Sequence, residues 1–435
     1  MYLGASRGVG DLDAETYKRK YAFGEDYGTS YFKYGPVGEK PFIAENRGIV
    51  LRERTILHKI YGIEEDVIVG DKVRHFLGSR DEMVRYLIYP MRDGIVKSDD
   101  KNSWEVIYAL TKMGLEESSP TDPKFDGFYV AAAISSLALT QARYMYKNLF
   151  DLHQKIDAET GLVKAVTIIP QPLAVAIAEK RITCIVIESG HGNTQICPIS
   201  RYPIKEAMFA LNRGGAEADA ITAEILKDLG YGDVAREEKI VREIKEHFGL
   251  IPYDLEKSIE VAKRDWKRFR GEPFRKYLLE IDFEKNSWMR FLIGEIIFNP
   301  GHEIFESYYR KGMPRPISTE FRGEPIEGTI SLADAIILSL GGVLYEIREE
   351  IVEKGGIILS GGNFSWQVPP GLDDVATDAA TKVRNELMKK GIPAQVKLVD
   401  EPQFSVWKGC IVYAVAVPDD YEWDWDTMEG WYKWR

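Results

Sequence analysis

The sequence predicts an α/β protein of two lobes, each with a β-sheet flanked by helices. The chain has 435 residues, 45% of them hydrophobic, which is more than one ordinary core holds and enough to fill two. Strand-like apolar runs alternate with helical ones along most of its length. One device also occurs twice: an acidic residue followed by a Gly-rich turn between two apolar runs. These three observations favour a duplicated α/β body.

The first copy of the device is "FGEDYGTSYFKYG", residues 23–35, in which aromatic residues lead into Asp26 and a polar turn. Its composition is typical of a β-hairpin. Backbone N–H groups of the turn, two hydroxyls and one positive charge could together bind phosphate. The residues that supply these groups are Gly28, Thr29, Ser30 and Lys33. Most isolated Gly-rich hairpins are only turns, so this copy alone decides nothing.

The second copy is "CIVIESGHGNTQICPI", residues 184–199, with Glu188 as its acidic residue. Gly190 and Gly192 open the turn, and Thr194 adds a hydroxyl. A carboxylate at the start of each hairpin could hold a hydrated Mg²⁺ through its waters. Two related hairpins in one chain therefore support a phosphate site more strongly than either alone.

The segments between and after the hairpins complete the α/β pattern. Strands are predicted for "FYVAAAIS", "KAVTIIP" and "GIILS", and helices for "AEADAITAEILKDLG" and "ATDAATKVRNELMKK". The segments "PQPLAVAIAE" (170–179) and "FSVWKGCIVYAVAV" (404–417) are predicted to connect the two lobes. Gln171 is the odd polar residue in the first connector, where it either satisfies backbone groups or orients a water molecule.

A third glycine pair follows the last predicted strand, in "LSGGNFSWQVPPG", residues 359–371. Gly361 and Gly362 allow a ligand to approach the backbone closely, beside Asn363 and Ser365. A plain turn after a strand is the simpler interpretation of this segment by itself.

Composition excludes several classes of function. The formal net charge of −11 and the absence of a basic stripe argue against a nucleic-acid partner. Cys184, Cys197 and Cys410 form no CxxC pair, so neither a disulfide framework nor a zinc site is indicated. No apolar run is long enough for a membrane span, and we expect a cytoplasmic protein.

The order of these motifs resembles that of the actin superfamily. "DYGTSYFK" is similar to its first phosphate loop, "ESGHGNTQ" to the second and "LSGGNFSW" to the adenosine loop. Further actin-like segments are "VIVGDKV", "YPMRDGIVKSDDKNSW", "REIKEHF", "RFLIGEIIFNPG" and "EIREEI". These segments resemble actins more than sugar kinases or seventy-kilodalton heat-shock chaperones. Together with "NRGGAEADAITAEILKDLGY" and the tail "EGWYKWR", they are most similar to the archaeal, crenactin-like actins.

The resemblance implies cofactors, ATP or ADP with Mg²⁺, and a role for each site residue. Asp26 and Glu188 would hold the metal through water, and Gln171, Gln195 and Glu188 would be the catalytic residues. The implied phosphate contacts are Gly28, Thr29, Ser30 and Lys33 from one lobe, and Gly190, His191, Gly192 and Asn193 from the other. The residues implied around ribose and adenine are Gly215, Lys245, Glu246, Gly361, Gly362, Asn363 and Ser365.

The chain departs from the actin pattern at three of these positions. Actins have aspartate where Glu188 and His191 stand, and histidine where Gln195 stands. Glu188 is one methylene longer than aspartate, so the water network must shift. We expect His191 to be exposed on its turn and to act as a phosphate-loop residue rather than as a general base. Hydrolysis without a strong base is expected to be slow.

The implied fold is the bilobal, ribonuclease H-like fold shared by actin, heat-shock chaperones and sugar kinases: two duplicated domains, in four subdomains, around a nucleotide cleft. The expected boundaries are 1–47 with 90–178 and 405–435 for subdomain 1; 48–89 for subdomain 2, including a loop at 51–63; 179–213 with 306–404 for subdomain 3; and 214–305 for subdomain 4. The aromatic tail from Tyr421 is expected to pack on its own lobe, with a partner site as the second interpretation.

The resemblance further implies a cytoskeletal protein that slowly hydrolyses ATP and assembles into nucleotide-dependent filaments. Its partners would be copies of itself and actin-regulating proteins. A non-polymerising, actin-related scaffold subunit that senses ATP remains an alternative, because loss of filament contacts would leave the nucleotide motifs intact. A small-molecule kinase is a weaker alternative, since no additional carboxylate is recognisable near the phosphate loops.

Overall fold

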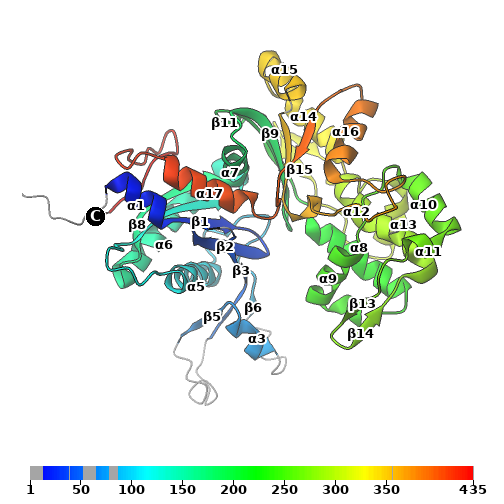
Figure 1. Ribbon diagram of the computed structural model, residues 1–435, viewed down its shortest axis with the longest axis horizontal. Coiled ribbons are helices and arrows are strands. Elements are labelled where there is room, and N and C mark those ends of the chain that lie inside the picture. Colours follow the sequence, from blue (N-terminus) through cyan, green and yellow to red (C-terminus); the bar gives the residue numbers. More distant parts are fainter. Residues whose placement is uncertain (1–12, 39, 52–64, 78–86, 355, 435) are drawn as a thin grey trace, which may run out of the picture. The chain divides into compact units, whose positions relative to one another are not determined.

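A computed structural model describes residues 13–38, 40–51, 65–77, 87–354 and 356–434 of the chain (Figure 1). The predicted loop from Arg52 to Ile63 lies outside these residues. The described chain divides into two compact units, one formed by residues up to Ala178 and from Val406, the other by Glu179–Ser405. Helix α7 (Gln171–Ala178) ends where the first unit ends, and α17 (Ser405–Ala416) begins where the second unit ends. The two segments predicted as connectors are therefore the two crossings between units.

The first unit is built on the sheet β3-β2-β1-β7-β8. Its elements before the crossing are α1 (Ala14–Tyr21), β1 (Ala22–Tyr27), β2 (Tyr31–Pro36), β3 (Phe42–Glu45), β4 (Gly48–Val50), β5 (Val67–Val69), α3 (Lys72–Leu77), β6 (Leu87–Ile88), α5 (Lys101–Glu117), β7 (Phe128–Ile134), α6 (Tyr144–Thr160), β8 (Val163–Pro170) and α7. Strands β5, β4 and β6 form a separate small sheet. Every residue of β1 and β7 is buried, as expected for central strands covered on both faces.

Helices cover both faces of the first sheet (Figure 1). On β1, a Cβ at Gly24 would lie 2.8 Å from the Trp407 ring of α17, so this side of the strand faces α17. The neighbouring residue Glu25 contacts His153 of α6, on the opposite face. Because side chains alternate along a strand, Asp26 shares the face of Gly24.

The second unit repeats this arrangement in the sheet β11-β10-β9-β17-β18. Its strands are β9 (Thr183–Ser189), β10 (Thr194–Ser200), β11 (Tyr202–Pro203), β12 (Phe209–Leu211), β13 (Phe274–Lys276), β14 (Leu279–Ile281), β15 (Thr319–Phe321), β16 (Glu324–Ile326), β17 (Ile357–Ser360) and β18 (Val396–Leu398). Its helices are α8 (Gly215–Asp228), α9 (Glu238–Phe248), α10 (Leu255–Arg264), α11 (Trp266–Phe269), α12 (Arg290–Phe298), α13 (Glu306–Arg310), α14 (Leu332–Gly341), α15 (Tyr345–Glu353) and α16 (Ala379–Lys389). Short 3₁₀ turns join some of these elements.

The five strands of the first sheet and five of the second have the same topology, and β12 pairs additionally with β10 in the second. In the first sheet, β1 forms an antiparallel hairpin with β2 and pairs in parallel with β7, which pairs in parallel with β8. In the second sheet, β9 forms an antiparallel hairpin with β10 and pairs in parallel with β17, which pairs in parallel with β18. Both Gly-rich segments thus form the predicted hairpins. The predicted strands and helices outside the hairpins are also present, and the duplicated α/β architecture is confirmed.

The aromatic tail packs on the first unit, as predicted. Trp431 is buried against Tyr129 in an edge-to-face contact, with ring centroids 5.1 Å apart. Tyr432 stacks on Phe150 of α6 at 4.4 Å, and its backbone exchanges two hydrogen bonds with Val166 of β8. The tail therefore lies along β8, the edge strand of this sheet.

The chain's described helices include none with both the length and the apolar character that a membrane crossing requires.

Candidate functional site

The first candidate half-site is the turn between β1 and β2. The Gly28 N–H donates to the carbonyls of Asp26 and Tyr31, both at 3.1 Å, and this closes the turn. A Cβ at Gly28 would lie only 2.8 Å from the Tyr31 oxygen, so the tight turn requires glycine. Asn46 donates to the Gly28 carbonyl at 2.7 Å and holds the turn from outside. Gly28, Thr29 and Ser30 remain partly exposed, where a ligand can reach them.

Asp26 is the buried centre of this half-site. Its side chain is 2% exposed and forms an ion pair with Lys33, which lies opposite it on β2, at 2.7 Å. Its other oxygen accepts a hydrogen bond of 2.7 Å from Gln171 Nε2, at the first residue of α7. Gln171 also donates to the Tyr27 carbonyl at 3.3 Å. The structure thus brings together Asp26, Lys33 and Gln171, which the sequence separates by up to 145 positions.

The second hairpin holds a matching arrangement. Glu188 lies opposite Gln195 on β10, just as Asp26 lies opposite Lys33, and Gln195 Nε2 donates to Glu188 at 3.0 Å. The turn is closed by the Gly190 N–H, which donates to the Asn193 carbonyl at 3.0 Å. Each half-site therefore has one carboxylate with one cross-strand partner: a cation in the first unit and a neutral amide in the second.

The start of α8 lies directly on the second turn. The N–H groups of Gly215 and Ala216 donate to the carbonyls of Gly190 and His191, both at 3.0 Å. A Cβ at Gly215 would lie 3.0 Å from Asn363 Oδ1 and 3.4 Å from both His191 Nδ1 and Lys245 Nζ. Three polar side chains from separate segments therefore converge on Gly215, which has no side chain.

His191 is not exposed on its turn, and the prediction that it would be was wrong. Its side chain is only 26% exposed, because α8 packs against the turn and brings Asp219 within 3.7 Å of the ring. Burial lowers the pKa of His191 to about 4, although the nearby Asp219 carboxylate partly opposes this shift. The imidazole is neutral near pH 7 and adds no positive charge to the loop.

The glycine pair after β17 is held against the second hairpin. Gly361 has φ 101°, a left-handed conformation that favours glycine, and a Cβ there would collide with the Ser189 carbonyl. Asn363 Nδ2 donates to Ser189 Oγ at 3.0 Å and to the Gly190 carbonyl at 2.6 Å. Gly362 has nothing within 4 Å of the place a Cβ would take. The hydroxyl of Ser365 is buried and has no hydrogen-bond partner among the described residues.

Lys245 and Glu246 follow each other on α9 but differ in environment. Lys245 is buried and forms an ion pair with Asp219 of α8 at 2.8 Å, whereas Glu246 is exposed. Sequence reasoning missed Asp219, which also lies 3.8 Å from Arg242. In the sequence, Asp219 is notable only as an acidic residue one helical turn after Gly215. This position does not indicate that Lys245 is its partner.

A family model named Actin matches residues 26–417. The chain belongs to the actin family. The match begins at Asp26, near the end of β1, and ends just after α17, so it includes the first turn with β2, the whole second hairpin, the glycine pair and both crossings. The chain has the actin fold, and the duplicated sheets are its two halves.

Two relatives show how far this actin-family chain has diverged. It is 25% identical over 181 residues to "Actin-related protein 3" of Dictyostelium discoideum, covering 39% of this chain and 41% of that protein. It is 26% identical over 286 residues to "Centractin" of Schizosaccharomyces pombe, covering 63% of this chain and 67% of that protein. The actin fold is thus retained at low identity.

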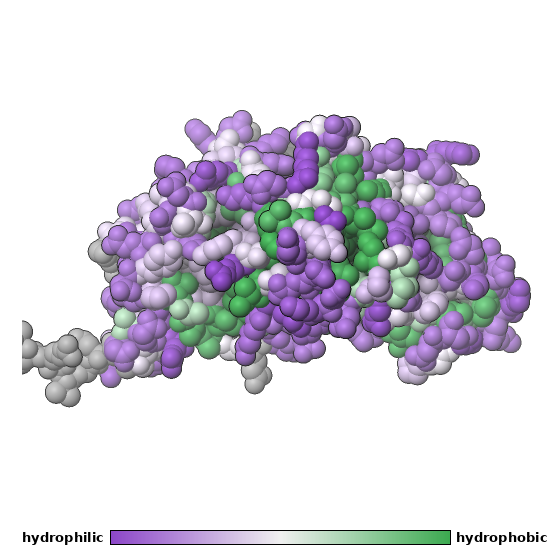
Figure 2. Space-filling view, turned by 90° about the horizontal axis from the view of Figure 1, so that it is seen from above, coloured by the Kyte–Doolittle hydropathy of each residue, from purple (hydrophilic) through white to green (hydrophobic). Residues whose placement is uncertain are grey.

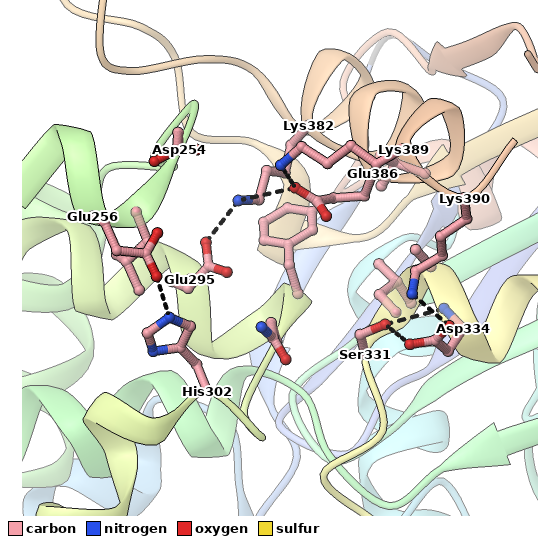
Figure 3. Close-up of a pocket in the computed structure, with 16 residues that line it drawn as sticks. Asp254, Glu256, Glu295, His302, Ser331, Asp334, Lys382, Glu386, Lys389 and Lys390 are labelled. Atoms are coloured by element: carbon pink, nitrogen blue, oxygen red, sulfur yellow. Dashed lines mark hydrogen bonds and ion pairs between the residues drawn. The ribbon is translucent and has the colours of Figure 1, made fainter.

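A separate polar pocket of about 320 Å³ lies elsewhere in the second unit of this actin-family chain (Figure 3). Its charged residues pair with one another: Lys382 with Glu295 at 2.9 Å, Lys389 with Glu386 at 3.0 Å, Lys390 with Asp334 at 2.7 Å, and His302 with Glu256 at 2.8 Å. Lys382 and Glu295 are almost fully buried. None of the predicted site residues lines this pocket.

Proposed function

We propose that this protein is an actin-like ATPase that binds ATP with Mg²⁺, hydrolyses it slowly and assembles into nucleotide-dependent filaments. The observation that carries the proposal is the matched pair of half-sites. Two hairpins of the same topology each hold a carboxylate with a polar partner at the same place in the register. The family membership supports the same activity.

The residues of the first half-site fit a hydrated Mg²⁺ and phosphate. Mg²⁺ prefers oxygen ligands and retains several waters, so a carboxylate such as Asp26 can hold it through the hydration shell. Lys33 is charged and partly exposed, and it can turn from Asp26 toward phosphate oxygens. Thr29 and Ser30 add hydroxyls on the same turn. When bound, Mg²⁺ would neutralise negative charge on the phosphate oxygens.

The residues of the second half-site fit the rest of the nucleotide. Gly215 leaves a space beside Lys245, Asn363 and His191 that a Cβ would fill. The Ser365 hydroxyl, which has no hydrogen-bond partner within the described part of the chain, offers a donor, and the open Gly362 allows close backbone approach. Glu188 and Gln195 would hold water near the phosphates from this side. We assign the ribose and adenine to this group, together with Glu246 and Gly361.

Slow hydrolysis follows from the side chains available. Efficient general bases have a pKa near the working pH, whereas the pKa of His191 is about 4. Gln171 and Gln195 can orient a water molecule but cannot remove its proton. Positioning of the water and stabilisation of charge would therefore supply most of the rate acceleration.

Replacing Gln171 with alanine should slow hydrolysis by about ten- to a hundredfold, while nucleotide affinity changes by less than about threefold. The amide holds Asp26 in place and would orient the attacking water. Phosphate release at saturating ATP and fluorescence titration with a nucleotide analogue measure the two quantities. An equal loss of both would show that Gln171 only supports the start of α7.

Filament assembly requires exposed surfaces that can bind another copy of the chain. Large apolar residues are exposed in the second unit, including Leu278 at 108%, Leu344 at 70% and Tyr345 at 69%. Figure 2 shows a face that is mostly hydrophilic, with apolar residues gathered in patches. Such patches are common where proteins associate. A head-to-tail contact that does not close would extend into a filament.

The finer parts of the proposal follow from the motifs. We assign the chain to the archaeal, crenactin-like actins, with the four subdomains bounded as predicted and with a cytoplasmic, cytoskeletal location. Actin-regulating proteins would be its other partners. The alternative is an actin-related scaffold subunit that binds ATP without polymerising, and the names of the relatives, actin-related protein 3 and centractin, favour it.

Sedimentation at high speed separates the two functions. The purified full chain is centrifuged with Mg-ATP, with Mg-ADP and without nucleotide, and pellets are examined by electron microscopy. Regular filaments that form only with ATP would support the actin-like function. Tight ATP binding without pelleting would favour the scaffold subunit, and absence of nucleotide binding would reject both.

A further inference from the structure

Glu25 is a buried acidic residue directly before Asp26. Its side chain is completely buried, on the face of β1 opposite Asp26. Central strands of this kind normally carry apolar residues on a face covered by helices. Burying a carboxylate is unfavourable unless it is paired, so this position needs an explanation.

The Glu25 carboxylate is the centre of a polar network in the core of the first unit. His153 Nε2, on α6, lies 3.0 Å from Glu25 Oε2, and the His153 ring is also completely buried. The Tyr27 hydroxyl donates to the same oxygen at 2.9 Å and shares a 2.7 Å hydrogen bond with Thr111 of α5. Glu25 Oε1 has no hydrogen-bond partner among the described residues. The network thus joins β1 to two helices.

His153 is placed to form an ion pair with Glu25 when its ring is protonated. Its Nδ1 lies 2.7 Å from the Leu149 carbonyl, which can only accept, so Nδ1 carries a hydrogen. Burial alone would lower the pKa of His153, but the Glu25 carboxylate outweighs this effect and the pKa is raised. With both ring nitrogens protonated, His153 donates to Leu149 and to Glu25.

Because Glu25 and Asp26 are adjacent, the register of β1 decides which of the two carboxylates faces the turn. Side chains alternate between the two faces of a strand, so a slip of one residue would move each of the two acids to the opposite face. Glu25 would then face the phosphate turn and Asp26 would face α6. His153 and Tyr27 bind a carboxylate at position 25, and this contact is lost in the slipped register. A buried polar pair that specifies register is a well-supported role for such groups.

We propose that Glu25 and His153 are positioning residues that fix Asp26 and the 27–31 turn in the orientation needed for Mg-ATP. The proposal rests on the proposed function. It assigns no contact with the nucleotide to either residue. Instead, the pair anchors β1 from the core side, while Gln171 and Lys33 hold Asp26 from the other side.

A set of variants separates positioning from simple stability. His153→Leu alone leaves the Glu25 charge buried and should lower the unfolding midpoint by roughly 10 °C. The double variant Glu25→Leu with His153→Leu replaces the pair by apolar side chains and should restore most of this loss. In the double variant, the amides of the 27–31 turn should still exchange with deuterium at least about tenfold faster than in wild type, and hydrolysis at saturating ATP should fall about tenfold or more.

Two further variants serve as controls. Glu25→Gln keeps a side-chain amide beside His153 Nε2 that can accept from the charged ring or donate to the neutral one, so this variant should stay within about threefold of wild type in exchange and hydrolysis. Tyr129→Phe removes a partly buried hydrogen bond to Asp419 at the other end of the same sheet, and should leave exchange of the turn unchanged. A double variant with wild-type exchange and hydrolysis would overturn the proposal. Exchange is measured without nucleotide, so it decides the positioning role even if the wild type fails to bind ATP and the proposed function falls.

Discussion

Replacing Asp26 with alanine should reduce Mg²⁺-dependent ATP hydrolysis by at least about a hundredfold while the protein stays folded. Asp26 contacts both Lys33 and Gln171 in the first half-site. Without its carboxylate, the hydration shell of a bound metal would lose an anchor, and the Gln171 amide would lose its shorter hydrogen bond and keep only the 3.3 Å bond to the Tyr27 carbonyl among those described. Lys33 is partly exposed, so water can solvate its charge and the fold should survive.

Phosphate release with Mg-ATP, compared with release in excess chelator, measures the effect. Circular dichroism checks the fold. Asp126→Ala is a suitable control, because Asp126 pairs with Lys164 at 2.8 Å on the surface of the same unit and belongs to neither half-site. Unchanged phosphate release from Asp26→Ala would reject the assignment of the first turn as a phosphate site.

Replacing Lys382 with methionine should destabilise the protein by about 3–5 kcal/mol at neutral pH. The variant leaves the Glu295 carboxylate buried in the pocket of Figure 3 without its 2.9 Å partner. Replacing both residues by leucine should recover most of the loss, since apolar pairs often replace buried ion pairs without penalty. Urea unfolding of the two variants and the wild type measures the differences.

The Lys382→Met loss should depend on pH in a defined direction. Burial raises the pKa of Glu295, although Lys382 opposes this shift, and removal of Lys382 would raise the pKa further. The folded variant then takes up a proton more readily than the unfolded chain, so its deficit relative to wild type should grow as pH rises and shrink toward about pH 5. Lys390→Met, which breaks an exposed pair with Asp334, should cost less than about 1 kcal/mol. Equal losses for both lysines would contradict this account.

The sequence was sufficient to predict both hairpins, the glycine pair and the two crossings, because each depends on local chemistry. An acid, a glycine and flanking apolar residues specify a turn within about ten positions. The wrong prediction for His191 had a different origin. His191 is buried because α8 packs on its turn and donates its first N–H groups to the carbonyls of the turn. The residues next to His191 in the sequence do not predict this packing.

Long-range pairs were the part that sequence reasoning could not supply. Glu25 and His153 lie 128 positions apart, and Asn363 and Ser189 lie 174 apart. Nothing in "GEDY" distinguishes the carboxylate that faces the core from the one that faces the turn until the strand's register is known. The same limit applies to Asp219, which becomes a partner of Lys245 only when α8 and α9 pack.

The aromatic tail along β8 has a practical consequence for purified protein. Exposed edge strands offer unpaired backbone groups and can template aggregation. Tyr432 pairs with Val166 of β8, and Trp431 and Trp434 anchor the same segment through Tyr129 and Asp157. A chain shortened before residue 421, or one with a bulky C-terminal tag that displaces the tail, would uncover this edge. The shortened or tagged protein could then pellet as amorphous or ribbon-like material with or without ATP. Sedimentation alone would not distinguish this material from a cytoskeletal polymer.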